Sequence, residues 1–270
     1  MISTSRTAPG PELGRQRAAL VGALLVVAVL AWWDTERRMG GMPSHSGVDL
    51  GGFGFFTASW IVMMAAMMFP SVAPAVIAYD RLRSSRRARG ASAPGVEGSA
   101  LFVAGYLVTW TAAGLLAYGL IEGVRASGAG IFAWDRAGRE IVSAVVLAGA
   151  AYQLTPLKDL CLIRCRGPLM FLLEHWKDGR AGAFRIGLLH GGWCVGCCWG
   201  FMAILLALGI MSMGWMAFVA ALIASEKLLP ARFHASRVVA TLLLALGLAV
   251  LLVPDHVPGL GNAGSAPMAM

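Results

Sequence analysis

The chain has 270 residues, of which 58% are apolar and only 13% are charged, and its mean hydropathy is +0.71. A water-soluble domain covers itself with charged side chains, so this composition excludes one. The net charge of +8 fits membrane topology and attraction to anionic lipid, and we expect no nucleic-acid partner.

Long stretches without Asp, Glu, Lys or Arg set the fold class. A helix needs about 20 apolar residues to cross a bilayer. The stretches are continuously apolar rather than alternating, which excludes the strands of a membrane barrel. The sequence therefore predicts an all-α, polytopic transmembrane helix bundle. The charge-free stretches are 18–33, 50–79, 98–121, 141–157, 186–225 and 238–254.

The fifth stretch is about twice as long as one span requires. It covers residues 186–225 and must fold back on itself, and the glycines at Gly209 and Gly214 favour a turn between them. This division gives about seven helices, of which the first, fourth and last are short.

Basic residues indicate the orientation of the bundle, because Lys and Arg collect on the cytoplasmic side. With seven spans and the N-terminus inside, the inner segments carry 17 of the 22 Lys and Arg residues. We therefore expect a multi-pass protein of the bacterial inner (plasma) membrane, with the N-terminus inside and the C-terminus outside. The predicted parts are a cytoplasmic tail at 1–17, the bundle at 18–254 and an outer tail at 255–270.

Two inner loops have different characters. The loop 80–99 combines an arginine cluster with Ser, Gly and Pro, and reads as a flexible connector. The loop 158–185 is amphipathic and contains a short helical pattern at Pro168–Lys177 that suits the membrane interface. At the end of the sixth span, Glu226 and Lys227 are expected to extend their side chains toward the interface, with an inward orientation of Glu226 as the lesser alternative.

All five cysteines lie between the inner end of the fourth span and the middle of the fifth. His190, Cys194 and Cys197 are spaced i, i+4 and i+7, so they share one helical face, with Cys198 at its edge. An ionisable residue inside an uncharged span marks function by default. The spacing predicts that one nitrogen and two or three sulfurs face the same partner, as metal ligation requires.

Two further groups are expected near this face. Cys161 and Cys165 are i, i+4 if their segment is helical, and they fall near the same membrane level as His190. The second group consists of four methionines on two neighbouring stripes of the second span. These are Met63, Met64, Met67 and Met68.

Soft thiolate and thioether ligands favour copper(I), and zinc is the second choice. The candidate metal ligands are His190, Cys194, Cys197, Cys198, Cys161 and Cys165, with the four methionines as a lower-affinity approach. We expect delivery or translocation of the metal, with a donor or acceptor protein as partner, and no enzymatic activity. No nucleotide-binding loop or zinc-protease motif occurs. Oligomeric state stays open.

Two alternatives stay open at this point. Cys194 and Cys197 form a Cys-x-x-Cys pair, which is typical of thiol–disulfide exchange, so a membrane oxidoreductase is the second hypothesis. The third is a structural subunit of a membrane complex, because free Cys and Met also serve as core packing.

The chain resembles a bacterial family of metal-binding integral membrane proteins, a domain of unknown function sometimes labelled copper chaperone. The resemblance extends from about Gly54 to Pro230 and implies an integral membrane protein with a metal site. It rests on the motifs Met63–Ser71, Tyr152–Lys158 with Cys161, Cys165, Arg166, Pro168 and Leu169, His190-Gly191 with Cys194–Trp199, Trp215-Met216, and Glu226-Lys227.

Overall fold

The computed structural model describes residues 11–39, 52–127, 134–208, 212–229 and 233–253, and every regular element within these ranges is helical. The predicted all-α fold class is confirmed. The nine helices of the described part are α1 (Pro11–Met39), α2 (Phe53–Ala88), α3 (Glu97–Ala126), α4 (Trp134–Tyr152), α5 (Pro156–Arg166), α6 (Pro168–His175), α7 (Gly179–Leu208), α8 (Met213–Leu228) and α9 (Ala235–Leu252).

Several of these helices qualify as membrane spans by length and composition, which indicates a multi-pass membrane protein. They are α1, α2, α3, α7 and α9, and a sixth arises if α4 and α5, which meet at an angle of 68°, form one bent span. The helix α8 has 16 residues and is shorter than a typical span. The count of seven therefore stays a prediction. The predicted turn does separate α7 from α8, although residues 209–211 lie outside the described part.

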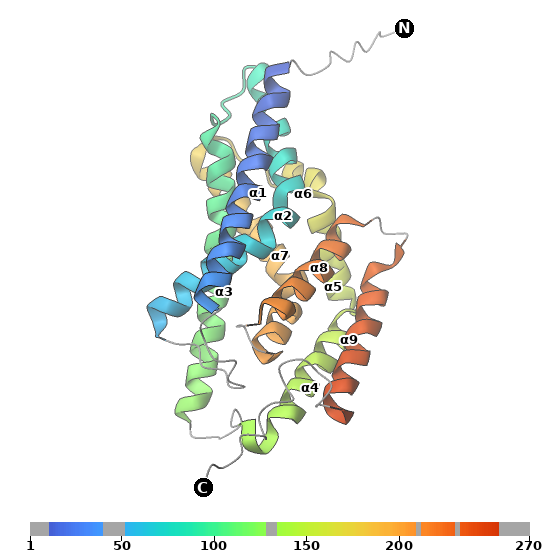
Figure 1. Ribbon diagram of the computed structural model, residues 1–270. Helices are drawn as coiled ribbons and strands as arrows, with labels where there is room; N and C mark the ends of the chain where they lie inside the picture. The colour runs from blue at the N-terminus through green and yellow to red at the C-terminus, as the bar shows by residue number, and fades with distance from the viewer. Residues whose placement is uncertain (1–10, 40–51, 128–133, 209–211, 230–232, 254–270) are drawn as a thin grey trace.

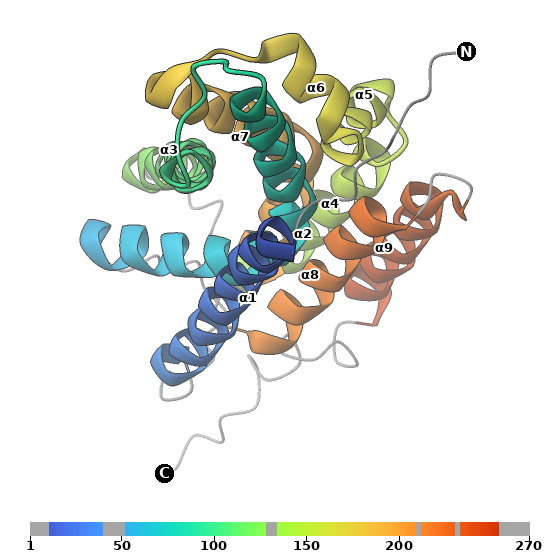
Figure 2. The ribbon, with the colours of Figure 1, turned by 90° about the horizontal axis from the view of Figure 1, so that it is seen from above.

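The helix α2 lies inside the bundle and packs against α1, α3, α6 and α8 (Figure 2). Its most apolar window is 67% buried and that of α7 is 56% buried, against 22% for α1 and 28% for α3. A helix that is apolar all round suits a core position. The two most enclosed helices are therefore those that carry the predicted methionine and cysteine ligands.

A proline inside α2 is accommodated by a partner from α1. Pro70 has no N–H group, so the carbonyl oxygen of Ala66, four residues earlier, lacks its helical donor. The indole Nε1 of Trp32 donates a hydrogen bond of 3.1 Å to that oxygen. This contact fixes α1 against the methionine-bearing part of α2.

The prediction of a flexible connector at 80–99 was wrong for its first part, because α2 continues to Ala88. Asp80 accepts hydrogen bonds from Arg83 on the next turn and from Arg17 on α1, the latter at 3.3 Å. Asp80 and Arg83 are both buried. Burial of a charge is tolerated when it is paired, and this pairing extends the helix beyond the apolar stretch.

The predicted inner loop 158–185 is largely helical, and the fourth span ends earlier than its charge-free stretch suggested. After α4 ends at Tyr152, Thr155 caps α5 by accepting a hydrogen bond from the backbone N–H of Lys158, and Pro156 occupies the first turn. This sequence is a strong helix start. The short helical pattern at 168–177 corresponds to α6.

The helices α3 and α7 approach each other closely at glycines. A Cβ atom on Gly187 of α7 would lie 2.1 Å from the carbonyl oxygen of Phe102, and one on Gly105 of α3 would lie 2.2 Å from that of Phe184. Small residues at such crossings let membrane helices pack backbone to backbone. The contact holds the cysteine-bearing helix against its neighbour.

We expect Gly187→Ala to separate α3 from α7 and to destabilise the protein by about 1–3 kcal/mol, because overpacking a tight contact costs that much. Gly192→Ala on the same helix is the matched control, since nothing lies within 4 Å of its added Cβ. The midpoint of thermal unfolding in detergent micelles measures the stability of both variants. Equal midpoints for the two would contradict the close packing.

Candidate metal centre

Three thiols from two helices meet in the interior of the bundle. The helix α7 presents Cys194 and Cys197 one turn apart, and α5 contributes Cys165; the three Sγ atoms lie within 4.8 Å of one another. Cys194 and Cys197 are buried and Cys165 is partly buried. The Sγ atoms of Cys165 and Cys197 are 3.5 Å apart. The predicted convergence of the two segments thus occurs through Cys165.

These separations fit a metal ion with three sulfur ligands. A soft ion ~2.3 Å from each of three sulfurs in one plane places the sulfurs about 4 Å apart. The thiol triad Cys165, Cys194 and Cys197 falls in that range, so small side-chain movements suffice for coordination. The donor set is soft, which suits copper(I) or zinc and not calcium or magnesium.

A lysine supplies positive charge to the triad. Nζ of Lys227, on α8, lies 2.9 Å from Sγ of Cys194 and 3.3 Å from Oγ of Ser71 on α2. The hydroxyl of Tyr106, on α3, lies 3.1 Å from the same sulfur. A cation and a hydroxyl at hydrogen-bond distance both stabilise a thiolate, because little else in a buried site offsets its negative charge.

A buried ion pair lies next to this lysine in the chain. Nζ of Lys158, on α5, donates to a carboxylate oxygen of Glu226, on α8, at 2.7 Å, and lies 4.7 Å from the centre of the Phe201 ring. Nε of Arg166 donates to the backbone carbonyl of Glu226. These contacts bind α5 to α8, so they fix Cys165 relative to Lys227.

The expectation that Glu226 and Lys227 both extend outward at the interface was wrong, and for Glu226 the alternative, an inward orientation, holds. Both side chains point into the bundle and find opposite charges or sulfur there. Adjacent helical residues are about 100° apart, and α8 is covered on both of these sides by α5, α7 and α2. In the sequence, Glu226 and Lys227 stood out as two charged residues at the end of an apolar span. That pattern does not show whether their side chains face outward or inward.

The other two predicted cysteines lie beside the triad. Sγ of Cys198 is 3.3 Å from Sγ of Cys197, so it borders the triad from the same helix. Sγ of Cys161 faces the backbone of Gly196, where an added Cβ would lie 2.8 Å from it. Cys161 is therefore the packing partner of a glycine. Neither thiol is part of the group of three whose Sγ atoms all lie within 4.8 Å of one another.

His190 lies one turn before Cys194 on α7 and is buried. Its ring is surrounded by the rings of Phe102, Tyr106 and Phe171, at centroid distances of 5.7, 6.2 and 5.5 Å. Among the described residues, Nδ1 has no hydrogen-bond partner. The imidazole thus has an uncommitted nitrogen in an aromatic cage close to the triad, and its role as a ligand stays a prediction.

The four predicted methionines are all buried in α2. Met68 is the one with a traceable connection to the triad, because its Sδ is 3.9 Å from the hydroxyl of Ser71, which in turn contacts Lys227. The sequence reasoning did not identify Tyr106 or Lys158. Tyr106 had one signal, a phenol inside an uncharged span, because a buried hydroxyl needs a partner.

Comparison with known proteins adds one match. Residues 57–250 match the family model PpoB2, described as a copper chaperone. No curated protein and no solved structure matches the chain significantly. The matched region contains every residue of the triad and its surroundings.

We expect Lys158→Met to destabilise the protein by about 3–5 kcal/mol, because it leaves the Glu226 carboxylate buried without its counter-charge. The double variant Lys158→Met with Glu226→Leu should be more stable than either single variant, since apolar replacement of a whole buried pair is often neutral. Denaturant unfolding of all four proteins completes the cycle. Additive losses would show that the pair does not interact.

Proposed function

Because the chain belongs to the PpoB2 copper chaperone family over residues 57–250, we propose that it holds copper(I) within the membrane for delivery or translocation. Its membrane is the bacterial inner membrane, and its partners are a metal donor and a metal acceptor protein. The ion is cargo, and no bond of a substrate is made or broken.

The observation that carries this proposal is the buried thiol triad with Lys227 beside it. Two or three thiolates around a single positive ion leave net negative charge, which is costly in a low-dielectric interior. The ammonium of Lys227 offsets part of that charge. Soft sulfur ligands at low coordination number select copper(I) over harder ions, and His190 is available as a further ligand.

The methionines supply a second, weaker set of soft ligands. Thioethers are neutral, so an ion can move onto them without proton release. Met68 lies at the end nearest Ser71 and Lys227, while Met63, Met64 and Met67 extend from it through the core of α2. We assign these four residues to the path by which the ion reaches or leaves the triad.

The orientation proposed for the bundle is N-terminus inside and C-terminus outside. The first turn of α1 and the last turn of α9 lie at opposite ends of the bundle (Figure 1), as an odd number of crossings requires. The excess of Lys and Arg in the inner segments supports the same orientation. Seven crossings result when α4 with α5 forms one bent span and α8 another.

A redox function is the second candidate, favoured by one distance. The Sγ atoms of Cys165 and Cys197 are 3.5 Å apart, close enough for a disulfide after a small rotation. In such a cycle the S–S bond between Cys165 and Cys197 forms as the two thiols pass two electrons and two protons to a partner disulfide, which is reduced to a dithiol.

We expect the anaerobically purified protein to bind one copper(I) at the triad, and Cys165→Ser, Cys194→Ser and Cys197→Ser each to bind it much more weakly, because each substitution removes one of three soft ligands. Cys161→Ser is the matched control and should retain the metal. Bound copper measured by mass spectrometry, together with titration of free thiols, checks this. Absence of copper combined with a reversible two-electron thiol titration would favour the redox function instead.

We expect Lys227→Met to weaken copper(I) binding by about tenfold or more, since loss of a charge-assisted contact is worth roughly 1.5–3 kcal/mol. Lys227→Arg keeps the charge and should retain most of the affinity. Competition with a chromogenic copper(I) chelator gives both values. Unchanged affinity in Lys227→Met would exclude a role for its charge.

A further inference from the structure

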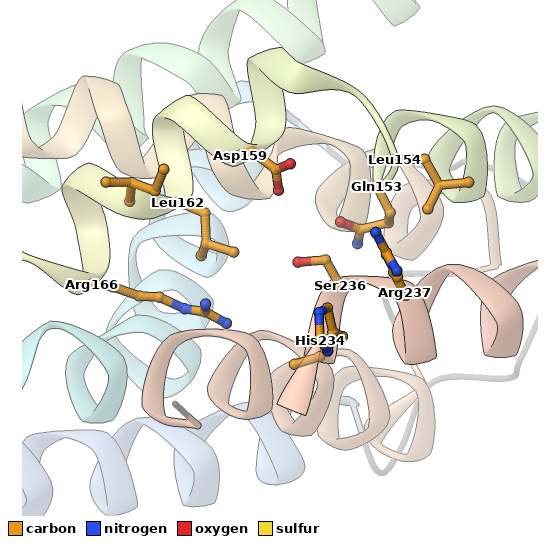
Figure 3. Close-up of a pocket in the computed structure, with 10 residues that line it drawn as sticks. Gln153, Leu154, Asp159, Leu162, Arg166, His234, Ser236 and Arg237 are labelled. Atoms are coloured by element: carbon orange, nitrogen blue, oxygen red, sulfur yellow. The ribbon is translucent and has the colours of Figure 1, made fainter. Parts of the chain in front are cut away.

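A polar cavity opens between α5 and the start of α9 (Figure 3). Its volume is about 350 Å³. Residues from three segments surround it: the break between α4 and α5, the outer face of α5 and the first turn of α9. The polar ones are Gln153, Asp159, Arg166, His234, Ser236 and Arg237.

Two buried polar atoms at this cavity lack partners among the described residues. They are Oε1 of Gln153, whose side chain belongs to a residue that is 3% exposed, and Nη2 of Arg166. A buried polar group without a hydrogen bond costs about 1–3 kcal/mol. Both atoms are covered in the structure, so a side-chain rotation presents this unused acceptor and this unused cationic donor to whatever occupies the cavity.

The other polar side chains at the cavity add further donors and acceptors. Figure 3 shows Arg166 on one side of the space and Arg237, next to Gln153, on the other, with the Ser236 hydroxyl and the Asp159 carboxylate between them. Arg237 and Ser236 add donors, and Asp159 adds an acceptor. The N-terminal turn of the 18-residue helix α9 favours an anion at the same place. The groups therefore match a ligand that carries both an anion and an ammonium group.

The rim of the cavity is apolar and exposed. Leu154 and Ile163 line the cavity and are each 65% exposed, and Val238, one residue beyond it, is 56% exposed. In a membrane protein such side chains face acyl chains. A ligand that is polar at one end and apolar at the other satisfies both parts of the site.

We propose that this cavity binds the headgroup of a phospholipid with a primary ammonium group, as in phosphatidylethanolamine. Arg166, Arg237 and Ser236 hold the phosphate, while Gln153 Oε1 and Asp159 accept hydrogen bonds from the ammonium. A quaternary ammonium has no N–H donors and leaves both acceptors unpaired. The acyl chains lie along Leu154 and Ile163.

The site is connected to the triad through the chain itself. Arg166 follows Cys165 directly, and its Nε contacts the carbonyl of Glu226, which precedes Lys227. A headgroup held by Arg166 therefore steadies the ends of α5 and α8 that carry a thiol and the ammonium. This consequence rests on the proposed copper function, whereas lipid binding does not.

The lipid site is tested on metal-free full-length protein in detergent, with native mass spectrometry as the readout. We expect phosphatidylethanolamine to be retained about tenfold more than phosphatidylcholine or phosphatidylglycerol, and Gln153→Leu to abolish this preference. Arg237→Gln should lower the retention of all three lipids, because each of them carries the phosphate. Arg180→Gln, an exposed arginine outside the cavity, is the matched control and should keep both the retention and the preference.

Three results would overturn the assignment. Equal retention of all three lipids by the wild-type protein would show that the cavity does not select a headgroup, and retention that Arg237→Gln leaves unchanged would show that the lipid binds elsewhere. Displacement of the lipid by glycerophosphoethanolamine would assign the site to a soluble compound. Arg237 is exposed, so its variant tests the site even if Gln153→Leu fails to fold.

The connection to the triad is tested separately. We expect copper(I) affinity to be several-fold higher in nanodiscs containing phosphatidylethanolamine than in phosphatidylcholine alone, and Arg237→Gln to remove the difference. Equal affinities in wild-type protein would overturn the connection and leave lipid binding intact. Loss of all copper binding in both membranes would instead overturn the proposed function.

Discussion

The cost of burying charge in an apolar bundle governs the arrangement of this protein. Lys158, Lys227 and Glu226 lie in the interior together with three thiols, and a low-dielectric interior penalises every one of these groups in its charged form unless it is paired. The pairing is complete only when α5, α7 and α8 are together, because Lys158 meets Glu226 and Lys227 meets Cys194 across helix boundaries. The charged contacts are thus what joins the three helices at the triad.

The break between α4 and α5 makes this arrangement possible. A straight continuation of α4 would direct Cys161 and Cys165 along the bundle axis, but the bend of 68° lays α5 against the middle of α7 and the C-terminal end of α8. Thr155 and Pro156 start the new helix in the changed direction, and the hydroxyl of Tyr152 donates to the carbonyl of Gly196 on α7. The same bend opens the polar cavity between α5 and α9, so the triad and the cavity occupy two sides of one short helix.

Membership in a copper chaperone family and the chemistry of the triad agree, since the matched region contains the three cysteines and their donor set is soft. A chaperone must hold its ion firmly yet release it to another protein. A site of three sulfurs with an ammonium close by meets both needs: the charge balance favours binding, and Ser71 gives Lys227 a second partner as the charge at sulfur changes. The buried methionines of α2 begin at that same serine.

Several properties followed from the sequence alone. The absence of charge over long apolar stretches gave the all-α membrane bundle, since lipid permits few other structures. Helical spacing placed His190, Cys194 and Cys197 on one face of α7, because that periodicity is local. The proposed ligand types, and with them the preference for soft metals, depend only on which side chains occur. The extents of α2 and α5 did not follow, because buried ion pairs and a cap extended helices into segments that composition marks as loops.

Only the tertiary structure decided which groups meet. The sequence could not tell which of two cysteines on α5 joins the triad. Cys165 joins it and Cys161 packs on Gly196, although the two lie one turn apart on the same short helix. Which thiol meets the triad depends on how α5 is rotated against α7. The sequence also gave the wrong orientation for Lys227. A charged residue at the end of an apolar helix can face the interface or the core with equal local preference. The orientation depends on whether another helix brings a partner for the charge.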